Sequence, residues 1–298
     1  MTPRTERLYV ADRALALDLI LATVGRTAEL ARFLDSLVAQ TVTNLRLIVV
    51  DQNDDERVAD ILSRYSQDIR LTRVTSEVGL SRARNVGLRH LEGDIVSFPD
   101  DDCWYPPDLL KRVTDDLARH PEWHGTTGRT VDEAARSSFV LWQKEPGLVT
   151  RQNVWRTAVA VTMFLRRPVV EQVGRFDESL GAGSGTPWRS GEETDYMLRA
   201  LTAGFTIGYD PELSVFHPSP KPELTEAAAR KAYFGGMGQS RVLRKHRYPS
   251  WFAAYRVLQL VAGSAFFLAR GKLALARFYW AMARGRAVGW VRGRQRLG

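Results

Sequence analysis

The sequence predicts an α/β protein with a mostly parallel, Rossmann-like central sheet, flanking helices and amphipathic helices at its C-terminal end. Short apolar runs alternate with segments of helical periodicity through the first half of the chain, as in the strand–helix–strand units of a parallel sheet. The chain has 298 residues, of which 44% are hydrophobic and 26% are charged. This composition is typical of a globular protein with a substantial core and excludes a disordered chain.

The predicted elements follow from these runs and periodicities. In the first half we expect strands at residues 17–22, 45–50, 69–74 and 94–98, and helices at 27–39, 58–65 and 80–91. A further helix is expected after Pro106 and Pro107, because proline suits a first helical turn. In the second half we expect strands at 159–165, 205–209 and 213–216, a helix at 192–203, and helices beyond Pro222.

The charge is distributed unevenly along the chain. No acidic residue follows Glu226, whereas 15 of the 42 Lys and Arg residues do. The part before Glu226 therefore holds more acidic than basic residues, although the net charge of the whole chain is +8. This asymmetry predicts an acidic body over residues 1–225 and a basic helical region over 226–298, with separate roles.

Three adjacent carboxylates, Asp100, Asp101 and Asp102, close the predicted strand at 94–98. Each raises the pKa of the others unless a cation lies beside them. Hard oxygen ligands suit Mg²⁺ or Mn²⁺, and open α/β sheets bind ligands beyond the carboxyl ends of their strands. The run predicts a metal–phosphate site, with a charged surface turn as the alternative. His217 ends a short strand and is a candidate further ligand, because imidazole also suits Mn²⁺.

Three more residues are candidates for binding a nucleotide. Thr23 and Asp51 end the first two strands and should lie beside the carboxylate run, although an Asp at this point also commonly caps a turn. Arg84 lies in the predicted helix at 80–91 and has the planar fork that suits a diphosphate. The alternative for Arg84 is an ordinary solvated arginine.

The start of the predicted helix at 192–203 is acidic and follows a Gly-rich loop at 181–187. A carboxylate there, Glu193 or Asp195, can serve as a general base for an incoming hydroxyl. Ser190 and Glu193 also have the spacing of a capping box, which is the structural alternative.

The chain resembles the family 2 inverting glycosyltransferases with the nucleotide-sugar-binding GT-A fold. Six segments carry the resemblance by their order and spacing over residues 17–218: LILATVGRTAELARFLDSL, LRLIVVDQND, GLSRARNVGL, GDIVSFPDDDCWYPPDLL, GRFDESLGAGSGTPWRSGEETDYMLRAL and VFHP. The resemblance implies a role for each candidate residue. Thr23 and Asp51 would bind the nucleoside, and Arg84 and Asp101 would bind the donor. Asp100 and Asp102 would occupy the metal- and ribose-binding "DXD" positions, with His217 as a further metal ligand. In relatives the helix start reads Gly-Glu-Asp and its Asp is the base. Glu193 holds that position here, and Asp195 is the second candidate.

The resemblance also implies the reaction, a metal-dependent direct displacement at the anomeric carbon of a nucleotide sugar. A UDP-sugar is the expected donor, Mn²⁺ or Mg²⁺ the cofactor, and a glycan or lipid-linked hydroxyl in envelope or polysaccharide synthesis the acceptor. Loops at 126–151 and 181–191 are expected to select the acceptor. The alternatives are a nucleotidyltransferase, which would normally show a Gly/Arg/Lys-rich phosphate loop after strand one, and a non-catalytic membrane-surface binding protein.

The basic region suggests where the protein works. Residues 250–269 are almost wholly apolar with Arg256 as their one charge, and Trp280 and Trp290 lie among the arginines that follow. This pattern favours helices in the interface of an anionic membrane, ahead of packing on the body or in a homodimer, and of a transmembrane span. No nucleic-acid-binding module accompanies the basic residues. The single Cys103 and the absence of a secretory signal pattern predict a cytoplasmic protein, peripheral on the inner face of the plasma membrane.

Overall fold

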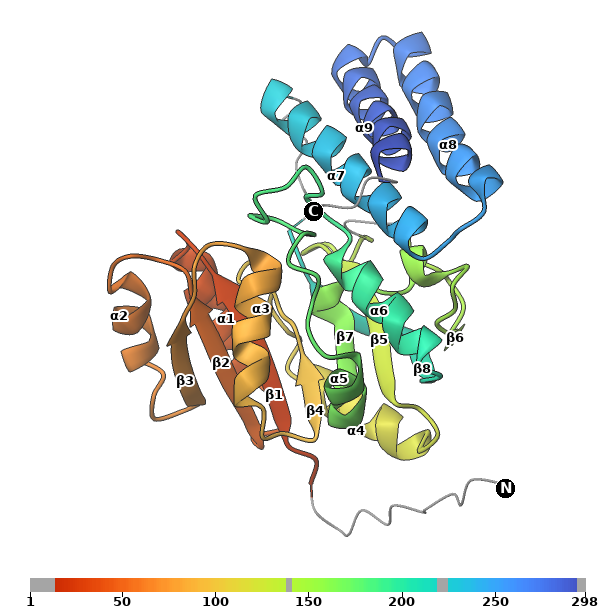
Figure 1. Ribbon diagram of the computed structural model, residues 1–298. Helices are drawn as coiled ribbons and strands as arrows, with labels where there is room; N and C mark the ends of the chain where they lie inside the picture. The colour runs from red at the N-terminus through yellow and green to blue at the C-terminus, as the bar shows by residue number, and fades with distance from the viewer. Residues whose placement is uncertain (1–13, 138–140, 219–224, 294–298) are drawn as a thin grey trace.

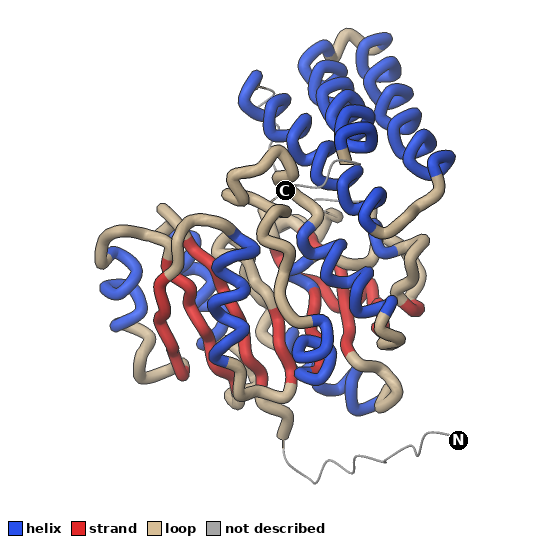
Figure 2. The backbone as a smooth tube through the Cα atoms, viewed as in Figure 1, coloured by secondary structure: helices blue, strands red, loops and turns tan. Residues whose placement is uncertain are grey.

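The computed structural model describes residues 14–137, 141–218 and 225–293. One mixed β-sheet forms the centre of the molecule, helices cover both of its faces, and three long helices form a layer at one end (Figure 1). The same layering is visible when the chain is coloured by secondary structure (Figure 2). The α/β class predicted from the sequence is confirmed.

The sheet has eight strands in the order β3-β2-β1-β4-β7-β5-β8-β6. Their bounds are β1 Leu17–Thr23, β2 Leu45–Asp51, β3 Arg70–Thr75, β4 Ile95–Ser97, β5 Gly125–Val131, β6 Gly147–Leu148, β7 Met163–Arg166 and β8 Ile207–Phe216. Strands β1 to β4 pair in parallel, whereas β7 is antiparallel to both β4 and β5. The parallel half therefore collects the carboxyl ends of its strands along one edge.

Apolar runs explain why the parallel half was predictable. All seven residues of β2 are buried, and so are all of β1 but one. Strands covered on both faces need such continuous apolar runs. Strand β1 pairs with β2 from Leu17 opposite Leu45 to Thr23 opposite Asp51, so the polar residues that end the two strands are neighbours.

The helices of the body cover the two faces of the sheet with separate apolar cores. One core takes side chains from α1 (Ala28–Val38), α2 (Arg57–Ser63) and α4 (Leu109–Arg119). The other takes them from α3 (Leu80–Gly87), α5 (Arg167–Val173) and α6 (Glu192–Thr202). Helix α1 buries Leu30, Phe33, Leu34 and Leu37, the face that its periodicity predicts. Short 3₁₀ helices lie at Leu88–His90, Val154–Arg156 and Ala160–Thr162.

Several predicted boundaries are wrong. Helix α3 ends at Gly87 rather than near residue 91, and α4 begins at Leu109, after the two prolines. The expected strand at 159–165 begins as a 3₁₀ turn and becomes strand only from Met163. The two short strands expected at 205–209 and 213–216 are one continuous strand, β8.

The largest omission is β5. Residues 126–151 were expected to form an acceptor loop, but the first six of them belong to this buried strand. Its sequence, GTTGRTV, has small and β-branched polar residues in place of an apolar run. Gly128 lets β5 approach β8 closely, because a Cβ there would lie 1.8 Å from the carbonyl oxygen of Leu213.

Three helices, α7 (Glu226–Lys245), α8 (Ser250–Ala269) and α9 (Leu273–Arg292), form the layer at the end of the molecule (Figure 1). They confirm the helical prediction over the described residues of this region. Helix α7 packs on the body and on α9, and α8 packs on α9. Among the described residues, α8 is the one helix whose length and composition would allow it to cross a membrane.

Candidate active site

The carboxylate run lies at the carboxyl edge of the parallel strands. Asp100 forms an isolated parallel bridge with Ala22 of β1, which fixes the backbone of the run beside that strand. The hydroxyl of Thr23 donates a hydrogen bond of 2.7 Å to Oδ2 of Asp101. Two of the residues that the sequence singled out are therefore in direct contact.

Asp100, Asp102 and His217 form a group that could hold a metal ion. One ligand atom from each lies within 4.8 Å of the others, and all three side chains are partly exposed. His217 follows β8, whose last residue, Phe216, exchanges two backbone hydrogen bonds of 3.0 Å with Trp104. This pairing brings residues 100 and 217 together although they are far apart in the sequence. Two carboxylates and an imidazole are a ligand set that suits Mn²⁺, and the carboxylates also suit Mg²⁺.

The third carboxylate has different partners. Asp101 accepts from Thr23 and is paired with Arg26, whose guanidinium also lies 2.8 Å from Asp102. Burial raises the pKa of Asp101, opposed by these two partners. Arg26 was not among the predicted site residues. Its signal in the sequence is its position just after β1, at the edge where the carboxylates gather.

Arg84 connects the carboxylate run to α6. Its guanidinium is 3.1 Å from Asp100 and 3.5 Å from Glu192, and the residue is only 1% exposed. The alternative of a solvated arginine is therefore wrong for Arg84. It does describe Arg82, which points outward and pairs with Glu77 at 2.6 Å. Arg84 therefore lies between the carboxylates of Asp100 and Glu192, and its positive charge offsets part of the repulsion between them.

Asp51 is fully buried and its carboxylate is engaged within the protein. Oδ1 accepts from the backbone and side-chain nitrogens of Asn53, and Oδ2 is 2.8 Å from Arg73. The bond from the Asn53 backbone is the turn-capping contact that the sequence left open as the alternative. The nucleoside-binding role of Asp51 stays a prediction.

The start of α6 is not held by a capping box. Gly191 is the N-cap residue with a left-handed φ of 90°, and no side chain caps the helix. Ser190 instead donates a 2.7 Å hydrogen bond to the carbonyl of Gly235 on α7. The capping box of Ser190 and Glu193, the structural alternative, is therefore wrong.

Glu193 has the environment of a proton acceptor. Burial raises its pKa well above the ordinary glutamate value, and the charge of Glu192 beside it raises the pKa further. A hydrogen bond from the backbone of Glu193 itself and the charge of Arg84 oppose this rise with smaller effects. A carboxylate with a raised pKa holds a proton more strongly, which is what a general base working near neutral pH needs.

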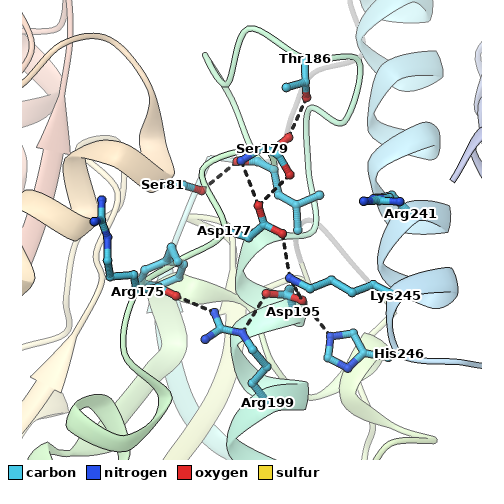
Figure 3. Close-up of polar contacts among 12 residues, drawn as sticks. Ser81, Arg175, Asp177, Ser179, Thr186, Asp195, Arg199, Arg241, Lys245 and His246 are labelled. Atoms are coloured by element: carbon cyan, nitrogen blue, oxygen red, sulfur yellow. Dashed lines mark hydrogen bonds and ion pairs between the residues drawn. The ribbon is translucent and has the colours of Figure 1, made fainter. Parts of the chain in front are cut away.

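Asp195 has the opposite environment (Figure 3). It is fully buried, and its oxygens lie 2.8 Å from both Lys245 and His246 and 3.0 Å from Arg199. Burial opposes its ionisation, but the His246 hydrogen bond and the charges of Lys245 and Arg199 outweigh burial and lower its pKa to about 2. Lys245 also reaches Asp177 at 2.7 Å. Asp195 thus ties α6 to the end of α7.

The Gly-rich loop lies against the start of α3. The backbone nitrogen of Leu80 donates to the carbonyl of Ala182 at 2.9 Å, and the Ser81 hydroxyl donates to the carbonyl of Leu180 at 2.8 Å. A Cβ on Gly183 would lie 3.0 Å from the Cα of Gly79, so the two chains meet backbone to backbone. This contact positions the loop that leads into α6.

Residues 18–173 of the sequence match the family described as Glycosyl transferase family 2, which is more than half of the chain. The chain belongs to this family. The resemblance that the sequence motifs carry is thus confirmed, and the family match covers the Asp100–Asp102 run but ends before α6 and His217.

Curated relatives extend the similarity further along the chain. The succinoglycan biosynthesis protein ExoM of Rhizobium meliloti is 30% identical over 256 residues, which cover 78% of this chain and 76% of ExoM. An uncharacterized glycosyltransferase of Haemophilus influenzae is 27% identical over 189 residues, and the match spans 62% of each protein. The present chain therefore spans less than two thirds of the length of the Haemophilus protein.

Solved structures show the same fold. The mannosyltransferase PcManGT of Pyrobaculum calidifontis, solved with GDP-Man and Mn²⁺, matches with a TM-score of 0.63 and 19% identity over 95% of this chain and 89% of that one. Residues 1–349 of S. aureus TarS, solved with UDP, match with a TM-score of 0.58 and 17% identity over 94% of this chain and 92% of that fragment. The predicted GT-A fold is confirmed by these neighbours.

We predict that Asp195 is a stabilising residue with a defined pH dependence. Its folded pKa of about 2 lies below the unfolded value, so its contribution is present above about pH 4 and is lost as the pH falls through about 2. Asp195→Asn should lower the free energy of unfolding at pH 7 by about 2–4 kcal/mol. Urea denaturation should show that the gap to the unmodified protein narrows towards pH 3.

Asp55→Asn is the matched control, because Asp55 is an exposed carboxylate paired with Arg57. Exposed pairs contribute little, so this variant should change stability far less. An Asp195→Asn variant as stable as the Asp55→Asn variant would contradict the structural role.

Proposed function

We propose that the protein is a metal-dependent, inverting glycosyltransferase that moves a sugar from a nucleotide sugar to an acceptor hydroxyl. One arrangement supports this proposal above the others. The carboxylate–histidine group of Asp100, Asp102 and His217 is joined through Arg84 to the first turn of α6, where Glu193 has the raised pKa of a general base. A metal–diphosphate site beside a base is what direct displacement of a nucleotide requires.

Asp100, Asp102 and His217 would hold Mn²⁺ or Mg²⁺, which would offset the charge that develops on the departing diphosphate. Arg84 has the task of positioning, because its guanidinium fixes Asp100 and Glu192 relative to each other. Thr23 orients Asp101 by its hydrogen bond at the base of the run. The chain thereby presents its ligand atoms in a fixed arrangement.

Glu193 is proposed to take the proton of the acceptor hydroxyl as that oxygen attacks the anomeric carbon. The attack occurs opposite the departing diphosphate, so the configuration at that carbon inverts. Asp195, the second candidate, has a pKa of about 2 and three basic partners, and is therefore a far weaker base.

A UDP-sugar is the proposed donor, bound through the nucleoside by Thr23 and Asp51 and near its diphosphate by Arg84 and Asp101. TarS has been solved with UDP-GlcNAc, and PcManGT with GDP-Man. The proposed acceptor is a glycan or a lipid-linked hydroxyl in polysaccharide or envelope synthesis, a proposal that the similarity to ExoM supports. We place the enzyme at the inner face of the plasma membrane, as a peripheral protein.

The proposed function predicts metal-dependent nucleotide binding. Calorimetry with UDP and with GDP, and a screen of the corresponding nucleotide sugars for turnover, should show binding and hydrolysis that Mn²⁺ or Mg²⁺ strengthens. Asp102→Ala should reduce the metal-dependent part of the affinity at least about tenfold. Asp115→Ala, which removes an exposed carboxylate on α4, is the control and should bind like the unmodified protein. Equal metal dependence in both variants would argue against the metal site.

The base assignment predicts that Glu193→Gln loses turnover but keeps the donor. Glutamine preserves the shape of the side chain and removes its basicity, so kcat should fall by about 10²–10⁴-fold while donor affinity changes little. Asp195→Asn, assayed at a temperature where it is folded, should keep more activity than Glu193→Gln. The reverse order would make Asp195 the base.

The pair of adjacent glutamates predicts a shift of the pH–rate profile. The acid limb of kcat/KM should lie above the ordinary glutamate range, because burial and Glu192 raise the pKa of Glu193. Glu192→Gln removes the like charge while keeping an oxygen for Arg84, so the pKa should fall and the limb should move to lower pH. Glu171→Gln, on the exposed side of α5, should leave the limb in place. An unmoved limb in Glu192→Gln would show that another group controls it.

A further inference from the structure

Helix α8 presents an apolar stripe that nothing in the described chain covers. Exposed apolar residues recur at every third or fourth position along its outer side: Trp251, Tyr255, Leu258, Ala262 and Phe266. Trp251 is 70% exposed and Leu258 is 64% exposed. When large exposed apolar side chains are grouped along one helix face, that face is usually an interaction surface.

Helix α9 has an outer side with the same spacing and a different chemistry. The exposed residues there are Leu273, Arg277, Trp280, Arg284, Ala287 and Val291, so two arginines lie among apolar residues. Arginine and tryptophan are side chains that pair an apolar part with a polar end. Such a face suits a boundary between hydrocarbon and water.

We propose that the outer sides of α8 and α9 form a docking surface for an anionic lipid bilayer, with both helices lying in the plane of its interface. This proposal rests on the proposed function for the place of the acceptor, but not for lipid binding itself. Charge selects the occupant. No acidic residue follows Glu226, so the arginines of α9 have no carboxylate on their own helices, whereas anionic headgroups attract them. In a homodimer through these sides, the exposed arginines of the two α9 helices would come together and repel each other.

The inner side of α8 explains why the helix lies on the membrane rather than across it. Ser264 donates to the carbonyl of Ala276 at 2.8 Å, and the rings of Phe267 and Tyr279 are 5.1 Å apart, so α8 is packed on α9. Arg256 lies 5.5 Å from the ring of Trp155 in the body, which ties the first half of α8 to the catalytic part. A span would carry Arg256 into hydrocarbon and break these contacts.

The docking surface lies at the same end of the molecule as the active site. Figure 1 shows the α7–α9 layer beyond the carboxyl ends of the parallel strands. Helix α7 touches the first turn of α6 directly, since a Cβ on Gly191 would meet Val242 at 2.8 Å and one on Gly238 would meet the Ser190 carbonyl at 2.4 Å. A bilayer on α8 and α9 would therefore lie at the same end of the molecule as the start of α6, with α7 between them, and a lipid-linked acceptor would be presented at that end.

The test is vesicle flotation of the full-length protein, with turnover of the nucleotide sugar measured in parallel without vesicles. Binding should be weak on phosphatidylcholine and stronger when phosphatidylglycerol is mixed in, and high salt should remove only part of it. The double variant Trp251→Glu and Leu258→Glu should weaken binding by more than about a hundredfold, because two apolar anchors become charged. Val38→Glu, at an exposed apolar residue of α1, is the matched control and should bind normally.

Arg277→Gln combined with Arg284→Gln tests the charge separately. Each basic residue near an anionic surface contributes about fivefold, so this variant should lose about 25-fold on the mixed vesicles and little on phosphatidylcholine alone. All variants should keep their turnover in solution. Vesicle binding that survives both double variants would overturn the proposal. Resistance of the bound protein to alkaline extraction would also overturn it, because it indicates a transmembrane span. A homodimer that dissociates only in the Trp251→Glu and Leu258→Glu variant would assign the surface to dimerisation instead. If the full-length protein floats with anionic vesicles but turns over no nucleotide sugar, the proposed function is rejected and the lipid-docking surface is retained.

Discussion

The buried guanidinium of Arg84 is the interaction on which the site depends. Two carboxylate groups gather at one edge of the sheet, the Asp100–Asp102 run and the Glu192–Glu193 pair, and like charges so close would separate without a cation between them. Arg84 contacts Asp100 on one side and Glu192 on the other, from a position that water does not reach. It thereby holds the proposed metal ligands and the proposed base at a fixed separation. A lysine would not do the same, because its single ammonium lacks the planar fork that contacts two partners at once.

A second ionic network extends this arrangement into the C-terminal region. Asp195 lies one turn into α6, and Lys245 and His246 reach it from the end of α7, so the helix that carries Glu193 is fastened at its start by Gly191 and Ser190 and further on by Asp195. The larger apolar core includes Met237 and Val242 of α7 together with the body. The sequence-based boundary at residue 225 stays a prediction, but the packing shows that α7 directly supports the start of α6, which carries the proposed base.

The sequence revealed what local patterns encode and missed what distant contacts decide. Strands β1 and β2, the carboxylate run and the helical end of the chain were predictable because apolar runs, adjacent charges and helical periodicity are local signals. Strand β5 was missed because its stability comes from close pairing with β8 through Gly128, which leaves no apolar run. The capping box stayed open as an alternative for Ser190 because the carbonyl that accepts its hydroxyl hydrogen bond, that of Gly235 on α7, lies 45 residues away in the sequence. The burial of Arg84 and the contact of Arg26 with Asp101 likewise depend on segments that only the fold brings together.

The basic residues of the C-terminal region form two groups in the structure. Some point into the protein, and others point to the solvent. Lys245 points inward to Asp195 and Asp177, and Arg286 is buried between α7 and α8, where its guanidinium bonds Gln239 and the carbonyl of Arg256 and burial lowers its pKa to about 9. Arg277 and Arg284 point outward among apolar side chains. The inward residues hold the helices together and on the body. The outward residues are therefore available to bind the proposed anionic membrane. Lys245 joins the end of α7 to Asp195 of α6, so the C-terminal helices that carry the outward arginines also support the helix of the proposed base.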